Sequence, residues 1–222
     1  MINRIQEWAE EVLERLKQDP RLGRYVDGTL PIPQPYCGSG EIRLVVLGQD
    51  PTVKNPISRR AIRTVLNLDK NRSVRAYLAG VCNGLSIQIA DSVYATNLYK
   101  NFFIRPPTQI TETDIFQEFL DAWLPLLQEE LKPYASVPVI TLGEPILAPL
   151  VGDHVSAKVR EYWGYTPEWR AGTMRSFEYI RAAHNQVNRS IFPFPHQPSL
   201  RKEFYKATMG AYVSFVKSAA FS

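Results

Sequence analysis

Cysteine is scarce in this sequence, and the two that occur, Cys37 and Cys82, stand far apart. They match no zinc spacing, provide no disulfide framework and are too few to ligate an iron–sulfur cluster. Long apolar runs are also missing, since none approaches the roughly 20 residues that span a bilayer. The charged N-terminal stretch MINRIQEWAEEVLERLKQ excludes a signal-peptide core. We therefore expect a cytoplasmic protein, nucleoid-associated if bacterial, that uses no metal, no iron–sulfur cluster, no other cofactor and no membrane.

Excess charge of one sign is small as well. The 26 basic and 22 acidic side chains leave a net charge of +4, with a pI near 9.0. Such a mild surplus permits a nucleic-acid partner without demanding one. A chain of 222 residues, 45% hydrophobic and 22% charged, suits one globular domain with a sizeable core. We expect a monomer with one domain over residues 1–222, divided into an N-terminal helix and loop (1–40), a core (41–202) and a C-terminal helix (203–222).

Strand-like and helical segments alternate along the chain. Apolar, strand-like stretches fall at 41–48, 92–99, 136–143 and 175–184, and RSIFPFPH at 189–196 is a short fifth strand or an extended loop. Helical periodicity occupies 2–18, 57–81, 111–131 (with Thr111 and Asp114 at capping-box spacing) and the chain from Ser199 onward. The Pro- and Gly-rich residues 28–40 predict a long connecting loop. Such alternation predicts an α/β fold: a three-layer α/β/α domain with a central, mainly parallel four-stranded sheet.

Polar residues follow the ends of the expected strands. The first strand ends in VVLGQDP with Asp50, the second contains Asn97 in YATNLYKNFFIRPP, and the third ends in TLGEP. A later segment, FPFPHQPSLRK, contributes His196. Because the carboxyl ends of parallel strands share one edge, Asp50, Asn97 and His196 are expected to converge over one pocket. Singly, Asp50 could merely shape its turn, Asn97 could cap one, and His196 could be a surface histidine.

These segments, in this order, resemble the signatures of the uracil-DNA glycosylase superfamily. VVLGQDP looks like the Gly-Gln-Asp-Pro-Tyr signature after the first strand, and YATNLYKNFFIRPP is similar to the segment that holds the base-reading asparagine. VITLGEP resembles the third strand with its DNA-backbone loop. PHQPSL resembles the closing His-Pro-Ser signature, with Gln197 inserted. The resemblance covers about residues 41–202 and implies removal of a base from DNA as the activity.

The resemblance gives each signature residue a chemical role. Excision breaks an N-glycosidic bond after the nucleotide has been flipped out of the stack. Asp50 would stabilise the oxocarbenium-like sugar and orient or deprotonate water, while His196, as a neutral donor, would stabilise the anionic O2 of the departing base. The amide of Asn97 matches uracil N3–H and O4 and rejects cytosine. The base-binding set is completed by Gly48, Gln49 and Thr52, with backbone amides near Gly48 and Gln49 cradling O2.

The same resemblance implies a DNA-binding set. Leu200, four residues after His196, would enter the vacated stack as a wedge, although it could equally be a core residue of the C-terminal helix. Arg201 and Lys202 would meet a neighbouring phosphate. The remaining predicted DNA contacts are Pro51, Gly143, Glu144 and Ser199.

The sequence also departs from the family pattern. Thr52 stands in place of the tyrosine that excludes the methyl group of thymine, so 5-substituted bases would be admitted. RRAIRTVLNL lacks the expected stacking aromatic, leaving Arg63, Phe102 or Phe103 as candidates. His184, directly after an apparent strand, rivals His196. We favour His196 because Pro-Ser-Leu and basic residues follow it.

Three functions remain open, in descending order. The first is a monofunctional DNA glycosylase for uracil or a related damaged base. The second is a non-catalytic nucleic-acid-binding relative that keeps the fold. The third is a small-molecule hydrolase acting on nucleosides, which would cleave free deoxyuridine but not oligonucleotides.

Overall fold

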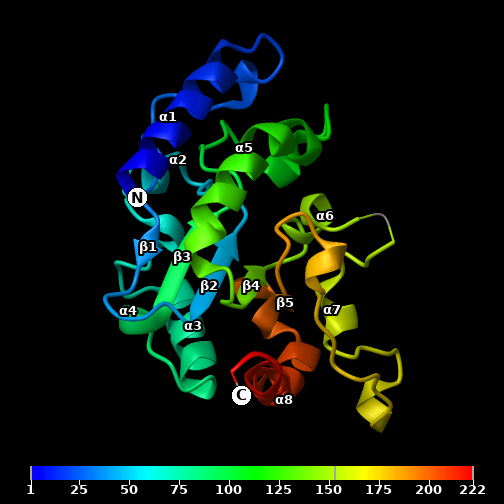
Figure 1. The fold of residues 1–222 in the computed structure, drawn as a ribbon. Coiled ribbons are helices and arrows are strands. Elements are labelled where there is room, and N and C mark those ends of the chain that lie inside the picture. The colour runs from blue at the N-terminus through cyan, green and yellow to red at the C-terminus, as the bar shows by residue number, and fades with distance from the viewer. Residues whose placement is uncertain (1, 153, 222) are drawn as a thin grey trace.

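A mixed, mainly parallel five-stranded sheet lies at the centre of the protein (Figure 1). The computed structural model describes residues 2–152 and 154–221; residues 1, 153 and 222 lie outside the description. The sheet has the order β1-β3-β2-β4-β5. The strands are β1 (Tyr36–Cys37), β2 (Leu44–Gly48), β3 (Val93–Asn97), β4 (Val139–Leu142) and β5 (Ile191–Phe194). Strands β2 to β5 run parallel, and β1 pairs antiparallel with β3 at one edge.

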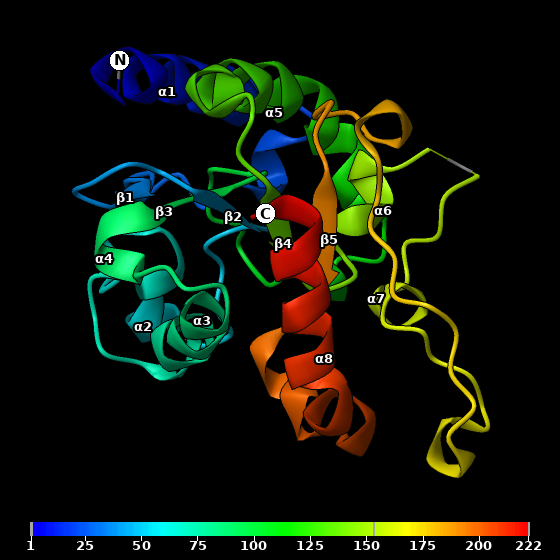
Figure 2. The ribbon, with the colours of Figure 1, turned by 60° about the horizontal axis from the view of Figure 1, so that its bottom comes forward.

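Helices flank both faces of this sheet. They are α1 (Ile2–Gln18), α2 (Pro56–Arg59), α3 (Ser73–Gly84), α4 (Ile89–Ser92), α5 (Ile115–Leu131), α6 (Leu147–Leu150), α7 (Val159–Tyr162) and α8 (Glu203–Ala220). Figure 2 shows α1 and α5 together on one side of the sheet and α3 and α8 on the other. Consequently all residues of β2 to β5 are buried, which explains why these strands are apolar without alternation. None of the described helices is long and apolar enough to cross a membrane.

Several expected elements are confirmed. Helix α1 occupies the predicted span 2–18, and α5 and α8 lie within the predicted helices. Strands β2, β3 and β4 lie within the predicted 41–48, 92–99 and 136–143. The open alternative for 189–196 is settled in favour of a strand, since β5 pairs with β4 from Ile191 to Phe194.

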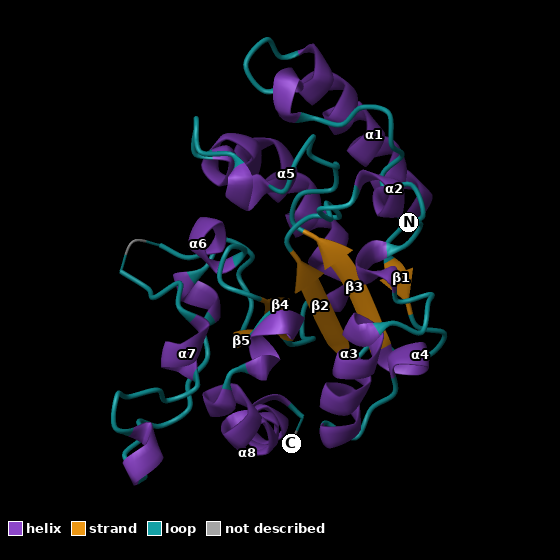
Figure 3. Ribbon diagram, turned by 180° about the vertical axis from the view of Figure 1, so that it is seen from behind, coloured by secondary structure: helices purple, strands orange, loops and turns teal. Residues whose placement is uncertain are grey.

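The predicted four-stranded sheet is wrong in strand number and in its fourth member. Residues 175–184 form no strand; a single bridge joins Ile180 to Ile191. The segment has the apolar side chains of a strand because these side chains are packed: Phe177 lies edge-on against Tyr212 of α8 at 5.6 Å, and Tyr179 stacks on Phe192 at 4.9 Å. Its apolar side chains are therefore covered without a strand partner, and Figure 3 shows loop over much of the chain between α6 and β5.

Three further expectations need correction. The loop predicted at 28–40 contains β1, and the amides of Gly38, Ser39 and Gly40 after it donate to carbonyls of residues 90–93. The basic stretch 57–81 is not one helix but α2, an irregular turn and α3. Helix α5 begins without the capping box at Thr111, because Asp114 is itself the N-cap and accepts from the Gln117 amide at 3.2 Å.

Candidate active site

A cavity of about 400 Å³ opens at the carboxyl ends of β2, β4 and β5. Its volume falls within the range typical of small-molecule sites, which is roughly 300–1,000 Å³. The predicted site residues that line it are Gly48, Gln49, Asp50, Thr52, Gly143, Glu144, His196, Ser199 and Lys202. The lining also includes residues that the sequence analysis did not select, among them Leu66, Pro106, Pro107, Thr108 and Tyr205. The sheet edge therefore brings most of the predicted residues together.

Asp50 both shapes its turn and faces this cavity. Its Oδ1 accepts the Thr52 amide at 2.7 Å, which is an Asx turn across Pro51, and the carboxylate lies on the cavity wall. Burial raises the pKa of Asp50 to about 6, partly offset by hydrogen bonds from Thr52 and by the charge of Arg59. The group is thus ionised in most molecules at neutral pH, as a charge-stabilising carboxylate or a base must be.

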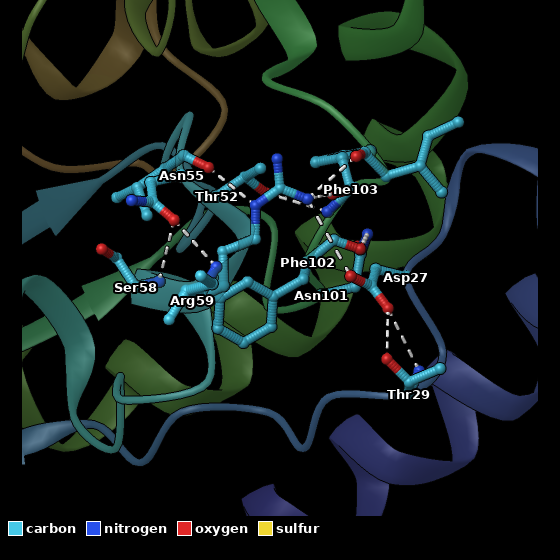
Figure 4. A network of polar contacts seen from close by, with 12 residues as sticks. Asp27, Thr29, Thr52, Asn55, Ser58, Arg59, Asn101, Phe102 and Phe103 are labelled. Carbon is cyan, nitrogen blue, oxygen red and sulfur yellow. Dashed lines mark hydrogen bonds and ion pairs between the residues drawn. The ribbon is translucent and has the colours of Figure 1, made fainter.

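A buried arginine braces the loop that carries Asp50. Arg59, only 3% exposed, donates from Nε to the Val53 carbonyl at 2.7 Å and from Nη1 to the carbonyls of Phe103 and Ile104, both at 2.9 Å. Asp27 lies 3.9 Å from the same guanidinium (Figure 4). Thr52 adds a second tie, because its hydroxyl oxygen accepts the Phe103 amide at 2.8 Å. The loops after β2 and β3 are therefore held as one unit.

Asn97 lies at the end of β3, directly beside Gly48 of β2. It is 1% exposed, and its Oδ1 has no hydrogen-bond partner among the described residues. A Cβ added at Gly48 would collide with this Oδ1, so only glycine leaves room for the amide. A buried, unpaired acceptor is costly, and a donor supplied by a ligand would relieve that cost.

The backbone beside Gly48 offers unpaired donors. Within residues 2–152 and 154–221, the amides of Gln49 and Asp50 donate to no acceptor, whereas the carbonyls of Gly48 and Gln49 accept from Leu98 and Tyr99 at 2.9 Å. Two adjacent free N–H groups at a cavity wall can bind an anionic oxygen.

His196 reaches the cavity from the end of β5. Two hydrogen bonds hold the backbone just before it: Tyr77 of α3 donates to the Pro195 carbonyl at 3.2 Å, and Trp163 donates to the Pro193 carbonyl at 2.7 Å. Gly143, at φ +98°, comes so close that an added Cβ would lie 3.2 Å from the His196 Cβ. Desolvation lowers the pKa of His196, which favours the neutral imidazole at neutral pH although part of the side chain remains exposed.

Leu66 is a wall residue that the sequence did not reveal. It sits in the irregular turn after α2 at φ 57°, a conformation that a leucine rarely adopts and that is typical of functional sites. From there it lines the cavity next to Gly48. No sequence signal marks a positive φ at leucine, so only the structure identifies it.

The remaining candidates lie elsewhere. Phe102 and Phe103 are buried in the core, and the guanidinium of Arg63 donates to the carbonyls of Arg60 and Ile62; none of the three lines the cavity. His184 lies in the turn that leads into the amino end of β5, away from the cavity edge.

Three of the residues predicted to contact DNA do not line the cavity. Pro51 is buried, Leu200 packs partly buried against the core, and Arg201 is exposed beside it. Leu200 lies in the 3-10 turn Gln197–Arg201 that precedes α8, so it is not a residue of the C-terminal helix itself.

The described residues contain no group of three or more His, Cys, Asp or Glu side chains that could hold a metal ion. Comparison with known protein families finds none whose sequence pattern matches the chain, and comparison with curated proteins finds no match either. The choice of function therefore depends on the residues and geometry of the cavity.

Proposed function

We propose that this protein is a DNA glycosylase that hydrolyses the N-glycosidic bond of a flipped-out uracil or related damaged base, in a three-layer α/β/α domain of the uracil-DNA glycosylase superfamily. The observation that carries the proposal is the placement of Asp50 and His196 on one cavity wall, with Asn97 buried beside it at Gly48. An acid, an amide and an imidazole at the carboxyl ends of parallel strands in one sheet are the groups that such excision requires.

Asp50 acts on the sugar. As the glycosidic bond lengthens, positive charge develops on the deoxyribose, and the carboxylate stabilises it electrostatically. The same carboxylate orients a water molecule toward the anomeric carbon and accepts its proton. Because its Oδ1 already accepts the Thr52 amide, the carboxylate is held in one orientation before substrate arrives.

The base leaves as an anion. Negative charge gathers on its O2 oxygen, where the free amides of Gln49 and Asp50 and a neutral His196 donate hydrogen bonds. The orphaned Oδ1 of Asn97 accepts N3–H, and its Nδ2 donates to O4. Cytosine, with a lone pair at N3 and an amine at C4, leaves both groups of the amide unpaired and is rejected.

Leu66 supplies the apolar surface against the base. It lies on the wall beside Gly48, where none of the aromatic or arginine candidates reaches. Thr52, with its hydroxyl accepting from Phe103, presents a small side chain to the cavity and admits substituents on C5 of a pyrimidine.

The proposal is tested by release of free base from DNA. Oligonucleotides that contain uracil, hypoxanthine or xanthine, single-stranded and paired, are incubated with the protein, and released base is identified by mass spectrometry. We expect release of at least one damaged base and none from undamaged DNA. Cleavage of free deoxyuridine without action on any oligonucleotide would overturn the proposal in favour of a nucleoside hydrolase.

A further inference from the structure

A second groove of about 360 Å³ adjoins the cavity. Glu144, Lys202 and Tyr205 line both hollows, so the groove and the cavity share these three wall residues. The far side of the groove is built by Lys158, Arg160 and Tyr165, from the segment around α7. No site prediction from the sequence fell on these three residues.

Basic side chains of this groove are free to bind an anion. In the part of the chain that the structure describes, neither Arg160 nor Lys202 has a carboxylate within ion-pair distance, and both are exposed. The Lys158 side chain is 60% exposed and meets Glu161 only at 4.0 Å. Among the described residues that line the groove, Glu144 is the one acid, and with Glu161 beside Lys158 two carboxylates stand against three cations.

Packing holds the groove in shape. The Arg160 guanidinium lies over the Tyr165 ring at 5.1 Å, and the Arg160 carbonyl accepts the Tyr165 amide at 3.0 Å. Tyr165 in turn packs edge-on against Phe204 of α8 at 5.0 Å. The cation is therefore presented on an aromatic platform fixed to a long helix, and little side-chain entropy is lost on binding.

We propose that this groove binds the backbone phosphate of a nucleotide adjoining the one held in the cavity, with Arg160 as its principal ligand and Lys158 and Lys202 beside it. The inference rests on the proposed function, because a polynucleotide whose base enters the cavity must leave over an adjoining surface. The groove shares a wall with the cavity and carries the cations that a phosphodiester requires, of which Arg160 and Lys202 have no carboxylate partner among the described residues. An acidic peptide would match the charge but has no reason to continue into the cavity.

The test measures binding, so that it does not require turnover. Affinity for a short single-stranded oligonucleotide with one central uracil is followed by fluorescence anisotropy between about 50 and 200 mM salt. Arg160→Ala is compared with the wild type and with Arg15→Ala, which removes an exposed arginine from α1 on the opposite face of the sheet. We expect Arg160→Ala to weaken binding about tenfold and to lower the salt slope by about 1, while Arg15→Ala changes neither.

A second measurement locates the phosphate. Each linkage within three nucleotides of the uracil is replaced singly by an uncharged methylphosphonate. We expect one or two linkages to weaken wild-type binding, and this penalty to disappear in Arg160→Ala. Equal penalties in both proteins, or equal effects of Arg160→Ala and Arg15→Ala, would overturn the groove assignment even if base excision is observed. Conversely, loss of the penalty in Arg160→Ala without excision of any base would leave the groove standing and overturn the glycosylase activity.

Discussion

Gly48 and Asn97 occupy one shared volume where β2 and β3 end side by side. The Asn97 Oδ1 lies where a side chain on residue 48 would begin, and Leu66 contacts the same position from the other side. The glycine is thus required by the neighbouring amide, since its own backbone is that of an ordinary strand residue.

Gly48→Ala is therefore expected to displace Asn97 without breaking the strand. We expect the single-turnover excision rate to fall by about 100-fold, because a misplacement of about 1 Å costs on this order, with a modest loss of thermal stability. Gly80→Ala, at a helical position with open space around it, is the matched control. An unchanged rate in Gly48→Ala would mean that the position of Asn97 does not matter for excision.

The raised pKa of Asp50 predicts the pH dependence. Excision should increase as pH rises through about 6, where Asp50 ionises, and level off above it. This rise of the excision rate with pH is measured as single-turnover rates between pH 4.5 and 8.5. A rate that does not depend on pH around 6 would show that the carboxylate is not the group required in its ionised form.

The same shift has a consequence for stability. A carboxyl whose folded pKa exceeds its unfolded value favours folding below the unfolded pKa, and this contribution is lost as pH rises through the folded pKa. With values of 3.8 and about 6, the loss falls between pH 4 and 6. Asp50→Asn should thus gain thermal stability over the wild type across that window, by no more than about 3 kcal/mol. Equal differences in melting temperature at pH 4 and pH 7.5 would contradict this.

Arg59 ties three loop carbonyls together, and a lysine cannot reach them all. Arg59→Met and Arg59→Lys should each lower the free energy of unfolding, Arg59→Met by about 3 kcal/mol or more, because buried carbonyls lose their donors and Asp27 loses its cation. Denaturant unfolding measures this, with Arg60→Met as the exposed neighbouring control. A stability equal to that of the control would show that the loops hold without the brace.

A buried ion pair lies beneath β3. Lys100, 4% exposed, pairs with Glu130, 3% exposed, whose Oε1 also accepts from the hydroxyls of Tyr94 at 2.7 Å and Thr96 at 2.9 Å. Lys100→Met should cost about 3–5 kcal/mol by leaving a buried carboxylate unpaired. Adding Glu130→Gln should recover most of that loss, because the amide oxygen still accepts both hydroxyls. A double variant as unstable as Lys100→Met would contradict this.

The sequence predicted the helices and strands whose pattern of apolar residues follows directly from which of their faces are buried. The apolar stripe of α1 and the unbroken apolar runs of β2 and β4 follow directly from burial on one or both faces. Strand β1 escaped prediction because Tyr36 and Cys37 lie in a Pro- and Gly-rich stretch and pair only through contacts distant in sequence. Residues 175–184 misled for the opposite reason, since Phe177 and Tyr179 are covered by side chains rather than by strands.

The residues of the cavity also fall into some that the sequence predicts and others that only the structure identifies. Asp50 and His196 line it as expected, because strand order places the carboxyl ends of β2 and β5 at one edge, whereas Asn97 is buried beside Gly48 and is not among the lining residues. Leu66 was not predictable, since its role depends on a positive φ. Nor was Arg160, whose position depends on the ring of Tyr165, which follows α7 and packs against Phe204 of α8.

The central claim is excision of a base by a site that depends on Asp50. The most direct measurement is alkali-induced strand scission after a single turnover on a uracil-containing oligonucleotide, with wild-type protein, Asp50→Asn, His196→Ala and the exposed-carboxylate control Asp121→Asn. We expect scission by the wild type and by Asp121→Asn, a rate lower by at least about 1,000-fold in Asp50→Asn, and an intermediate loss in His196→Ala. Scission that persists unchanged in Asp50→Asn would contradict the account. Absence of scission with every damaged base, while DNA binding is intact, would contradict it as well.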